Sequence, residues 1–247
     1  MEAYVYDVLN QDGWWWEVGR RALARRLLEH YSPAAANGER PRILEIGCGS
    51  GALLQDLQEK NNVYGMDVAG AALKICRERG LDCVSMGDVT ALPYGDEAFD
   101  TVIAIDVLEH IDDESAALRE IHRVLKPGAT LIVTVPAFQM LWSRRDVDHH
   151  HKRRYRVGEI RKRLRDGGFK VVKATYVNLP VFFPLFLMVK AGQLSAEDTS
   201  SVSKDFGIVP KPVNAALARL MEAEARITPH VNLPFGSSIA CVGRKRS

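Results

Sequence analysis

The architecture of this chain follows from the segment Arg42-Ile43-Leu44-Glu45-Ile46-Gly47-Cys48-Gly49-Ser50-Gly51-Ala52-Leu53-Leu54. Its apolar beginning predicts a buried strand, and the leucines at its end predict an amphipathic helix. Three glycines at alternate positions join the two elements, and glycine allows a tight turn and a close approach of the backbone to a ligand. The start of the helix adds free N–H groups and a positive dipole end. The segment therefore predicts a ligand-binding turn between a strand and a helix.

A second apolar run, 63–66, ends at Asp67, which lies 20 residues after Gly47. The glycine spacing matches the G-x-G-x-x-G/A fingerprint, so the motif alone leaves open a dinucleotide or another adenosine-containing ligand. An acid at the position of Asp67 suits the hydroxyls of a ribose. Glu45, inside the first strand, has no obvious use in a nicotinamide site. It therefore favours an adenosine-containing ligand other than a dinucleotide.

From Pro41 onward the hydrophobic pattern alternates between strands and helices. The predicted strands are 42–47, 62–67, 83–87, 101–106, 129–135, 169–177 and 238–243. The predicted helices are 50–60, 70–79, 113–125 and 157–166. Such alternation is typical of an α/β fold with a doubly wound, mostly parallel sheet, in which ligands bind beyond the carboxyl ends of the strands.

Several motifs at these strand ends carry a family resemblance. Glu45-x-Gly47-x-Gly49-x-Gly51 followed by Asp67 resembles the first two motifs of class I S-adenosylmethionine (SAM)-dependent methyltransferases. The segment 88–100 resembles the D-x-x-x-L-P-[FY]-x-[DE]-x-x-F-D signature of the type 11/12 subgroup, which includes the quinone-biosynthesis methyltransferases. The segments 106–111 and 125–129 resemble further motifs of that subgroup. The resemblance covers residues 40–136.

The resemblance implies a Rossmann-like sheet of seven strands with an antiparallel last strand between the fifth and the sixth. It implies S-adenosyl-L-methionine as cofactor, with Asp67 on the ribose, Asp88 and the next N–H on the adenine, and Asp106 beside the methionine part. We expect Trp16 and Arg20 to close over the methionine end, with the guanidinium on its carboxylate. The expected cofactor-binding residues are Trp16, Arg20, Glu45, Gly47, Cys48, Gly49, Gly51, Asp67, Val68, Asp88, Val89 and Asp106.

The methyl carbon of SAM is already activated, so the protein's main task is to hold an acceptor in line with the C–S bond. A hydroxyl or acidic carbon would also need a base, and histidine is the usual one at neutral pH. His151 is the first candidate for this base, with Tyr155 and His149 behind it in the same segment. His110, at the end of the fourth strand, is a separate second candidate. A solvated polar turn is the alternative reading of the histidine run. Adjacent histidines cannot readily all face one ion, so we expect no metal site.

Composition and charge narrow the class of protein. The chain has 247 residues, of which 47% are hydrophobic, and a net charge of +2, so global charge indicates no partner. Residues 144–173 hold 12 Lys/Arg and 4 Asp/Glu, which suits either an anionic acceptor or a solvated basic helix. No aromatic set accompanies these charges, so we expect no nucleic acid.

Four cysteines without metal or redox spacing indicate free thiols, and the first residues lack the pattern of a signal peptide, so we expect a cytoplasmic protein. The longest apolar run, 179–189, is too short to span a bilayer. Peripheral membrane contact and a monomer or homodimer stay open.

We predict three parts: an N-terminal helical segment over the cofactor (1–40), a SAM-binding domain (41–177 and 237–247) and a helical cap (178–236). An apolar cap beside a basic segment suits a small acceptor with an apolar body and a polar or anionic head. The predicted enzyme methylates oxygen or carbon of a small molecule in a biosynthetic reaction. The alternative is an NAD(P)-dependent oxidoreductase on the same glycine-rich fold.

Overall fold

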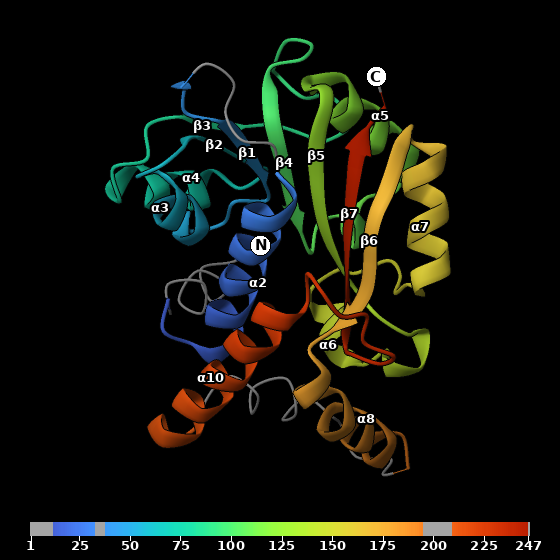
Figure 1. Ribbon diagram of the computed structural model, residues 1–247. Helices are drawn as coiled ribbons and strands as arrows, with labels where there is room; N and C mark the ends of the chain where they lie inside the picture. The colour runs from blue at the N-terminus through green and yellow to red at the C-terminus, as the bar shows by residue number, and fades with distance from the viewer. Residues whose placement is uncertain (1–11, 33–37, 195–208, 247) are drawn as a thin grey trace.

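A seven-stranded sheet forms the centre of the molecule, and helices cover both of its faces (Figure 1). The structure, a computed structural model, describes residues 12–32, 38–194 and 209–246. The strands are β1 (Arg42–Ile46), β2 (Asn62–Asp67), β3 (Val84–Met86), β4 (Phe99–Ile105), β5 (Leu125–Pro136), β6 (Phe169–Val177) and β7 (Ser238–Lys245). The helices are α2 (Trp15–Tyr31), α3 (Ala52–Leu57), α4 (Gly70–Glu78), α5 (Glu114–Val124), α6 (Arg144–Asp148), α7 (Val157–Asp166), α8 (Leu179–Leu194) and α10 (Lys211–Ile227), with 3-10 turns η2 (Leu108–His110) and η3 (Gln139–Leu141).

The strand order is β3-β2-β1-β4-β5-β7-β6. Neighbours among β1 to β5 pair in parallel, whereas β7 lies between β5 and β6 and is antiparallel to both. The predicted Rossmann-like sheet with an antiparallel last strand is thereby confirmed. The order reverses between β1 and β4, and at this switch point the carboxyl ends of the strands leave room for a ligand.

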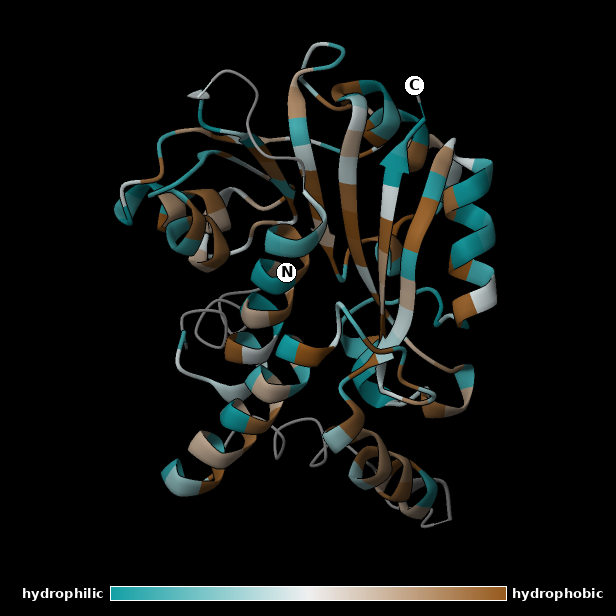
Figure 2. Cartoon of the chain, in the orientation of Figure 1, coloured by the Kyte–Doolittle hydropathy of each residue, from teal (hydrophilic) through white to brown (hydrophobic). Residues whose placement is uncertain are grey.

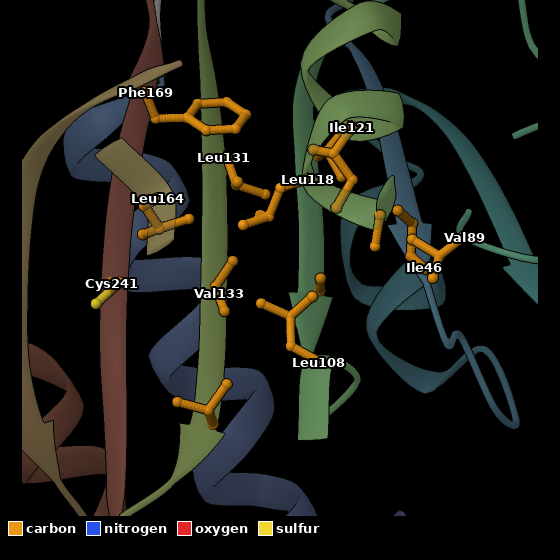
Figure 3. Packing of buried hydrophobic residues seen from close by; sticks show 14 of the residues in the cluster. Ile46, Val89, Leu108, Leu118, Ile121, Leu131, Val133, Leu164, Phe169 and Cys241 are labelled. Atoms are coloured by element: carbon orange, nitrogen blue, oxygen red, sulfur yellow. The ribbon is translucent and has the colours of Figure 1, made fainter. Parts of the chain in front are cut away.

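The period-2 alternation of the strands sends neighbouring residues to opposite faces of the sheet. On one face Leu131 and Val133 of β5 pack with Leu118 of α5 and Leu164 of α7, and Figure 3 shows this layer. On the other face the intervening residue, Ile132, packs in a second cluster with residues of α2, α3 and α10. Burial on both faces explains why these strands are almost continuously apolar.

The boundaries of two elements differ from the prediction for local reasons. The helix after the glycine turn starts at Ala52 instead of residue 50, because Gly51 has a left-handed backbone with φ of 76°. Strand β5 starts at Leu125 instead of residue 129, because Leu125 pairs with Phe99 at the start of β4.

Two helices from the predicted cap, α8 and α10, lie partly beyond the carboxyl edge of the sheet (Figure 1). Buried Trp15 of α2 packs with Val181 of α8 and Met221 of α10. Its backbone N–H donates to the side chain of Asn214 at 2.9 Å. The N-terminal helix and the cap therefore meet at one end of the sheet. Residues 195–208 of the cap, and 1–11 and 33–37 of the N-terminal segment, lie outside the described residues.

Helix α8 is mostly hydrophobic along its length (Figure 2). Of the helices that the structure describes, none combines the length and hydropathy needed to cross a bilayer.

Candidate functional site

The glycine turn after β1 is anchored to the neighbouring strand. The N–H groups of Gly47 and Cys48 both donate to the carbonyl of Met66 at the end of β2, at 2.7 and 3.1 Å. Gly47 has φ of 71°, and a Cβ there would lie 2.8 Å from Val107 Cγ2. Glycine is therefore required at this position both for the backbone conformation and for the space in front of it.

Asp67 lies against this turn. One of its carboxylate oxygens accepts from the N–H of Gly49 at 2.9 Å, and the other accepts from the N–H of Ala69 at 2.9 Å. The side chain is partly exposed, and the next residue, Val68, is 68% exposed. Each carboxylate oxygen keeps a further lone pair, so the carboxylate is oriented by the backbone and still open to two hydroxyl donors.

Asp88 follows β3, the next strand along the edge. Its exposed carboxylate accepts from the N–H and the hydroxyl of Thr90, both at 2.8 Å. These hydrogen bonds hold the pKa of Asp88 below its usual value. Val89 beside it is buried in the core. The edge thus presents the glycine turn, Asp67 and Asp88 at the ends of three adjacent strands.

Charged groups from α2, β1 and β4 meet at the switch point. Arg20 donates to Glu17 at 2.9 Å and pairs with Asp106 at 3.3 Å between Nε and Oδ2. Glu45 is 6% exposed, and its Oε2 has no hydrogen-bond partner among the described residues. Burial raises the pKa of Glu45 well above its usual range, although the charge of Arg20 opposes this shift.

Trp16 and Arg145 lie together near this group. The guanidinium of Arg145 lies over the ring of Trp16, 5.7 Å from the centroid. Burial, together with the charge of Arg154, lowers the pKa of Arg145. Among the described residues Arg145 forms no ion pair with a carboxylate, whereas Arg20 is already paired. Arg145 is therefore a second guanidinium that could take the carboxylate of a ligand.

His151, which follows α6, is held by a fully buried carboxylate. Its Nδ1 lies 2.9 Å from Oδ1 of Asp146, and the same carboxylate accepts two hydrogen bonds from Arg154, at 2.8 and 3.0 Å. Burial alone raises the pKa of Asp146, but the hydrogen bonds from His151 and Arg154 outweigh it and lower the pKa to about 2. An ionised carboxylate only accepts, so Nδ1 carries a hydrogen, and in the neutral imidazole Nε2 is the nitrogen with a free lone pair.

His110 and Glu109 of η2 lie next to His151. The rings of His110 and His151 are 4.8 Å apart and meet edge to face. Burial and the proximity of His151 lower the pKa of His110. Glu109 is completely buried, and burial followed by the charge of Asp106 raises its pKa well above the usual range. We call Glu109, His110 and His151 the histidine cluster.

The other two predicted bases lie outside this cluster. Tyr155 is 1% exposed, and its hydroxyl donates to Glu114 of α5, so the structure does not offer it to an acceptor. This position corrects the expectation that Tyr155 acts as a base, because its phenolic hydrogen is already used in the core. His149 is exposed, and its ring centroid is 5.9 Å from that of His151.

Comparison with known proteins identifies the part of the chain that contains the glycine turn, Asp67 and Asp88. Residues 44–133 match the family described as "Methyltransferase domain". The chain carries a class I methyltransferase domain. The solved putative methyltransferase of Haloferax volcanii, in a complex with the Trm112 methyltransferase activator, shares its fold with a TM-score of 0.63 and 20% identity, over 99% of this chain and 95% of that one.

Curated relatives of this methyltransferase domain act on different acceptors, according to their names. A tRNA (carboxymethyluridine(34)-5-O)-methyltransferase of Arabidopsis thaliana is 38% identical over 38% of this chain and 23% of its own length. The malonyl-[acyl-carrier protein] O-methyltransferase of Erwinia pyrifoliae is 34% identical over 46% and 42%. The ubiquinone biosynthesis O-methyltransferase of Pseudomonas aeruginosa is 32% identical over 38% and 43%. The chain thus spans less than half the length of these relatives.

The cofactor of this methyltransferase domain is S-adenosyl-L-methionine, and the residues at the edge fit it. Asp67 offers two carboxylate oxygens for the ribose hydroxyls, and Asp88 lies one strand further along for the adenine. The buried Oε2 of Glu45 lacks a partner among the described residues, and the amino group of a methionine would supply one. Arg145 and Arg20 are the cations beside it for the carboxylate.

Four residues of the site were missed from sequence alone as functional positions: Glu109, Asp146, Arg154 and Arg145. Asp146 and Arg154 belong to the basic segment 144–173, which was interpreted only as a whole, as a place for an anionic acceptor or as a solvated helix. Glu109 lies inside the motif 106–111, where its charge next to an apolar strand was the available signal. No local pattern singles out Arg145 among the arginines of the basic segment.

Proposed function

We propose that this protein is a SAM-dependent methyltransferase that methylates an oxygen or an acidic carbon of a small molecule. One observation carries the proposal: Asp67 of the cofactor edge and an oriented histidine, His151, both lie at the carboxyl ends of the strands. Asp67 ends β2, and the residue after His151 donates its N–H to Glu109, which follows β4. The open Nε2 of His151 is the feature that a proton-bearing acceptor needs beside it. Free thiols support a cytoplasmic location.

SAM supplies a methyl group on a sulfonium, so the acceptor atom forms a bond to the methyl carbon while the C–S bond breaks and its electron pair stays on sulfur. The acceptor must also lose its proton. His151 is positioned to receive it, because Asp146 and Arg154 hold the ring through Nδ1. His110 and Glu109 lie beside His151 at the same place.

An aromatic group at the cap supports an acceptor with an apolar body. Phe138, two residues after β5, stacks on Tyr176 with centroids 4.7 Å apart and meets Phe182 of α8 at 5.7 Å. Phe182 in turn contacts Phe186 and Phe235. The N–H of Phe138 donates to the carbonyl of Tyr155, which ties these aromatics to the segment that carries His151.

The basic segment supports a small molecule over a tRNA acceptor. Six of its 12 cationic side chains pair with carboxylates of the fold, so much of the local charge is neutralised. Arg153 and Arg163 both pair with Glu114, and Arg154 pairs with Asp146. A phosphate backbone is bound mainly by free cations. We therefore propose that these arginines organise the site, and a tRNA acceptor is the competing outcome of the experiment below.

Calorimetric titration of the purified protein with SAM, S-adenosylhomocysteine and NAD tests the cofactor and separates the methyltransferase from an oxidoreductase. We expect binding of the first two and none of NAD. Incubation with SAM labelled in its methyl group, first with a metabolite extract and then with total tRNA, tests the acceptor. Label in an extractable small molecule supports the proposal. Label only in tRNA, or binding of NAD alone, contradicts it.

A further inference from the structure

The histidine cluster contains a buried carboxylate without a partner. Glu109 is 0% exposed, and neither of its oxygens accepts a hydrogen bond from any of the described residues. Buried polar groups in folded proteins are almost always hydrogen-bonded, and a buried carboxylate without a partner is costly. Among the described residues, no group satisfies the carboxylate of Glu109 with a hydrogen bond.

The side chains that face Glu109 are metal ligands by type. One ligand atom each from Glu109, His110 and His151 can be chosen such that all three lie within 4.8 Å of one another. Glu109 and His110 are brought there by the end of β4, and His151 by the segment after α6, whose N–H at Lys152 donates to the carbonyl of Glu109 at 2.8 Å. The backbone therefore fixes the two segments against each other.

The hydrogen bond to Asp146 leaves one nitrogen of His151 for the cluster. Because Nδ1 is bonded to Asp146, Nε2 is the nitrogen with a free lone pair. A carboxylate on the second nitrogen is the arrangement that orients histidine ligands in metal sites. The charge of Asp146 is itself balanced by Arg154 at 2.8 Å, so the carboxylate can remain ionised behind the ring.

Asp106, three residues before Glu109, does not belong to the ligand set. Its Oδ1 accepts from the hydroxyl of Thr134 at 2.8 Å, and its Oδ2 pairs with Arg20. Arg20 thus already balances the charge of Asp106, and Glu109 is the carboxylate for which the described residues offer no ion pair. A divalent cation would supply one.

We propose that Glu109, His110 and His151 form a binding site for a divalent transition-metal cation such as Mn²⁺ or Zn²⁺. Two imidazoles and one carboxylate suit such ions and leave coordination positions open for other ligands. The site assigns the lone pair of His151 to a metal ion instead of to a proton, and the class of acceptor that follows from it rests on the proposed function. The sequence did not predict the site, because the histidines of the run 149–151 cannot converge, whereas the fold brings in Glu109 and His110.

The open positions define the class of acceptor. A cation at this place would bind an acceptor through oxygen, and it would lower the pKa of a hydroxyl that binds it. The hydroxyl proton would then pass to water, the oxygen would form the bond to the methyl carbon, and the C–S bond would break with its electron pair on sulfur. An acceptor with two neighbouring oxygens, one of them a hydroxyl, fits this requirement best.

Binding of Mn²⁺ to the full-length protein after removal of metals with a chelator tests the site. The electron paramagnetic resonance signal of free Mn²⁺ measures binding, and thermal unfolding with and without Mn²⁺ measures stabilisation. We expect Mn²⁺ to bind and to raise the unfolding temperature of the natural protein. Glu109→Gln and His151→Gln should weaken binding by at least about tenfold.

Two features keep the outcome interpretable. Glu109→Gln conserves the shape of the side chain and cannot carry a charge in the buried site, so the variant should unfold no earlier than the metal-free natural protein. His149→Gln is the matched control, because His149 belongs to the same histidine run but is exposed and outside the cluster, and it should bind Mn²⁺ normally.

SAM titration of the same samples separates this inference from the proposed function. Mn²⁺ binding that is lost in Glu109→Gln and His151→Gln but kept in His149→Gln supports the site. SAM binding without Mn²⁺ binding overturns the metal site and leaves His151 as the base. Mn²⁺ binding without SAM binding supports the site and overturns the methyltransferase. Mn²⁺ binding that survives both cluster variants lies elsewhere and overturns the inference.

Discussion

At the scale of single residues, the cofactor edge depends on carboxylates that the backbone orients before any ligand binds. Asp67 shows this most clearly, since the N–H groups of Gly49 and Ala69 each take one of its oxygens at 2.9 Å. A side chain held in this way loses little further freedom when it binds a ribose. Preorganisation of this kind increases affinity without any additional contact.

Asp67→Ala should weaken SAM binding by about 2–3 kcal/mol, the scale of a pair of charge-assisted hydrogen bonds. Calorimetric titration measures the change. Asp67→Asn keeps one acceptor oxygen and should fall between the natural protein and the alanine variant. Asp82→Ala, at an exposed carboxylate outside the cofactor-binding set, is the control. Native SAM affinity in a folded Asp67→Ala protein would contradict the assignment.

At the scale of elements, the cap is joined to the sheet through the beginning of α8. Glu224 of α10 accepts from the N–H groups of Asn178 and Leu179, the latter at 2.8 Å. A carboxylate from another helix thus accepts from two of the N–H groups at the start of α8 that have no partner within the helix. Asn178, with φ of 64°, makes the turn out of β6 that allows this contact.

Glu224→Ala should lower the free energy of unfolding by about 1–3 kcal/mol, because it leaves two N–H donors without their acceptor in a buried place. Urea unfolding followed by circular dichroism measures the loss. Glu222→Ala, two residues before Glu224 on the same helix and outside this contact, should change stability by less than about 0.5 kcal/mol. Equal losses in both variants would show that α10 responds to any truncation.

The pH dependence of stability offers a second measurement on the same residue. Burial raises the pKa of Glu224 above its ordinary value of 4.5, although the two N–H groups oppose the shift. Between pH 4.5 and the raised pKa the unfolded chain has already lost this proton while the folded one keeps it. Stability should therefore fall as pH rises through this window, and Glu224→Gln, which cannot titrate, should show a smaller fall.

At the scale of the whole molecule, three helices far apart in the chain, α2, α8 and α10, meet at the carboxyl edge of the sheet. Helices α2 and α10 run in the same direction, because Trp15 contacts Asn214 near their starts and Tyr31 donates to the carbonyl of Pro229 near their ends. A Cβ on Gly19 of α2 would lie 2.8 Å from the Cβ of Met221, so the two helices pack closely. Deletion of α2 would therefore remove core packing as well as Trp16 and Arg20.

The exposed aromatic surface of α8 predicts how the cap acts. Phe183 is 57% exposed, so Phe183→Asp should leave the fold intact and reduce acceptor turnover by on the order of tenfold or more. SAM affinity should stay within about threefold, less than 1 kcal/mol. A methyl-transfer assay and calorimetry measure the two effects.

The matched control is Leu220→Asp on α10, at a side chain that is 52% exposed. Turnover should be unaffected there. If Phe183→Asp lowers SAM binding and turnover together, α8 has a structural role. Loss of a dimer in size-exclusion chromatography with full activity of the monomer would make this surface an interface.

The sequence by itself determined the sheet, its order of elements and the place of the cofactor edge. These features depend on spacings between near neighbours: alternation in strands, the three- and four-residue spacing in helices, and the glycines between Ile46 and Ala52. Such patterns are present in the chain before it folds. The antiparallel position of β7 followed from family resemblance, because nothing local in 238–245 states which strands it joins.

Only the tertiary structure decided which side chains the site can use. Tyr155 and Arg154 are neighbours in sequence. The hydroxyl of Tyr155 nevertheless donates to Glu114 in the core, whereas Arg154 pairs with Asp146, the carboxylate that orients His151. Glu109 meets His151 across 42 residues of chain, a contact that depends on how the segment after α6 packs against β4. Contacts of this kind arise from the packing of distant elements, so no local spacing records them.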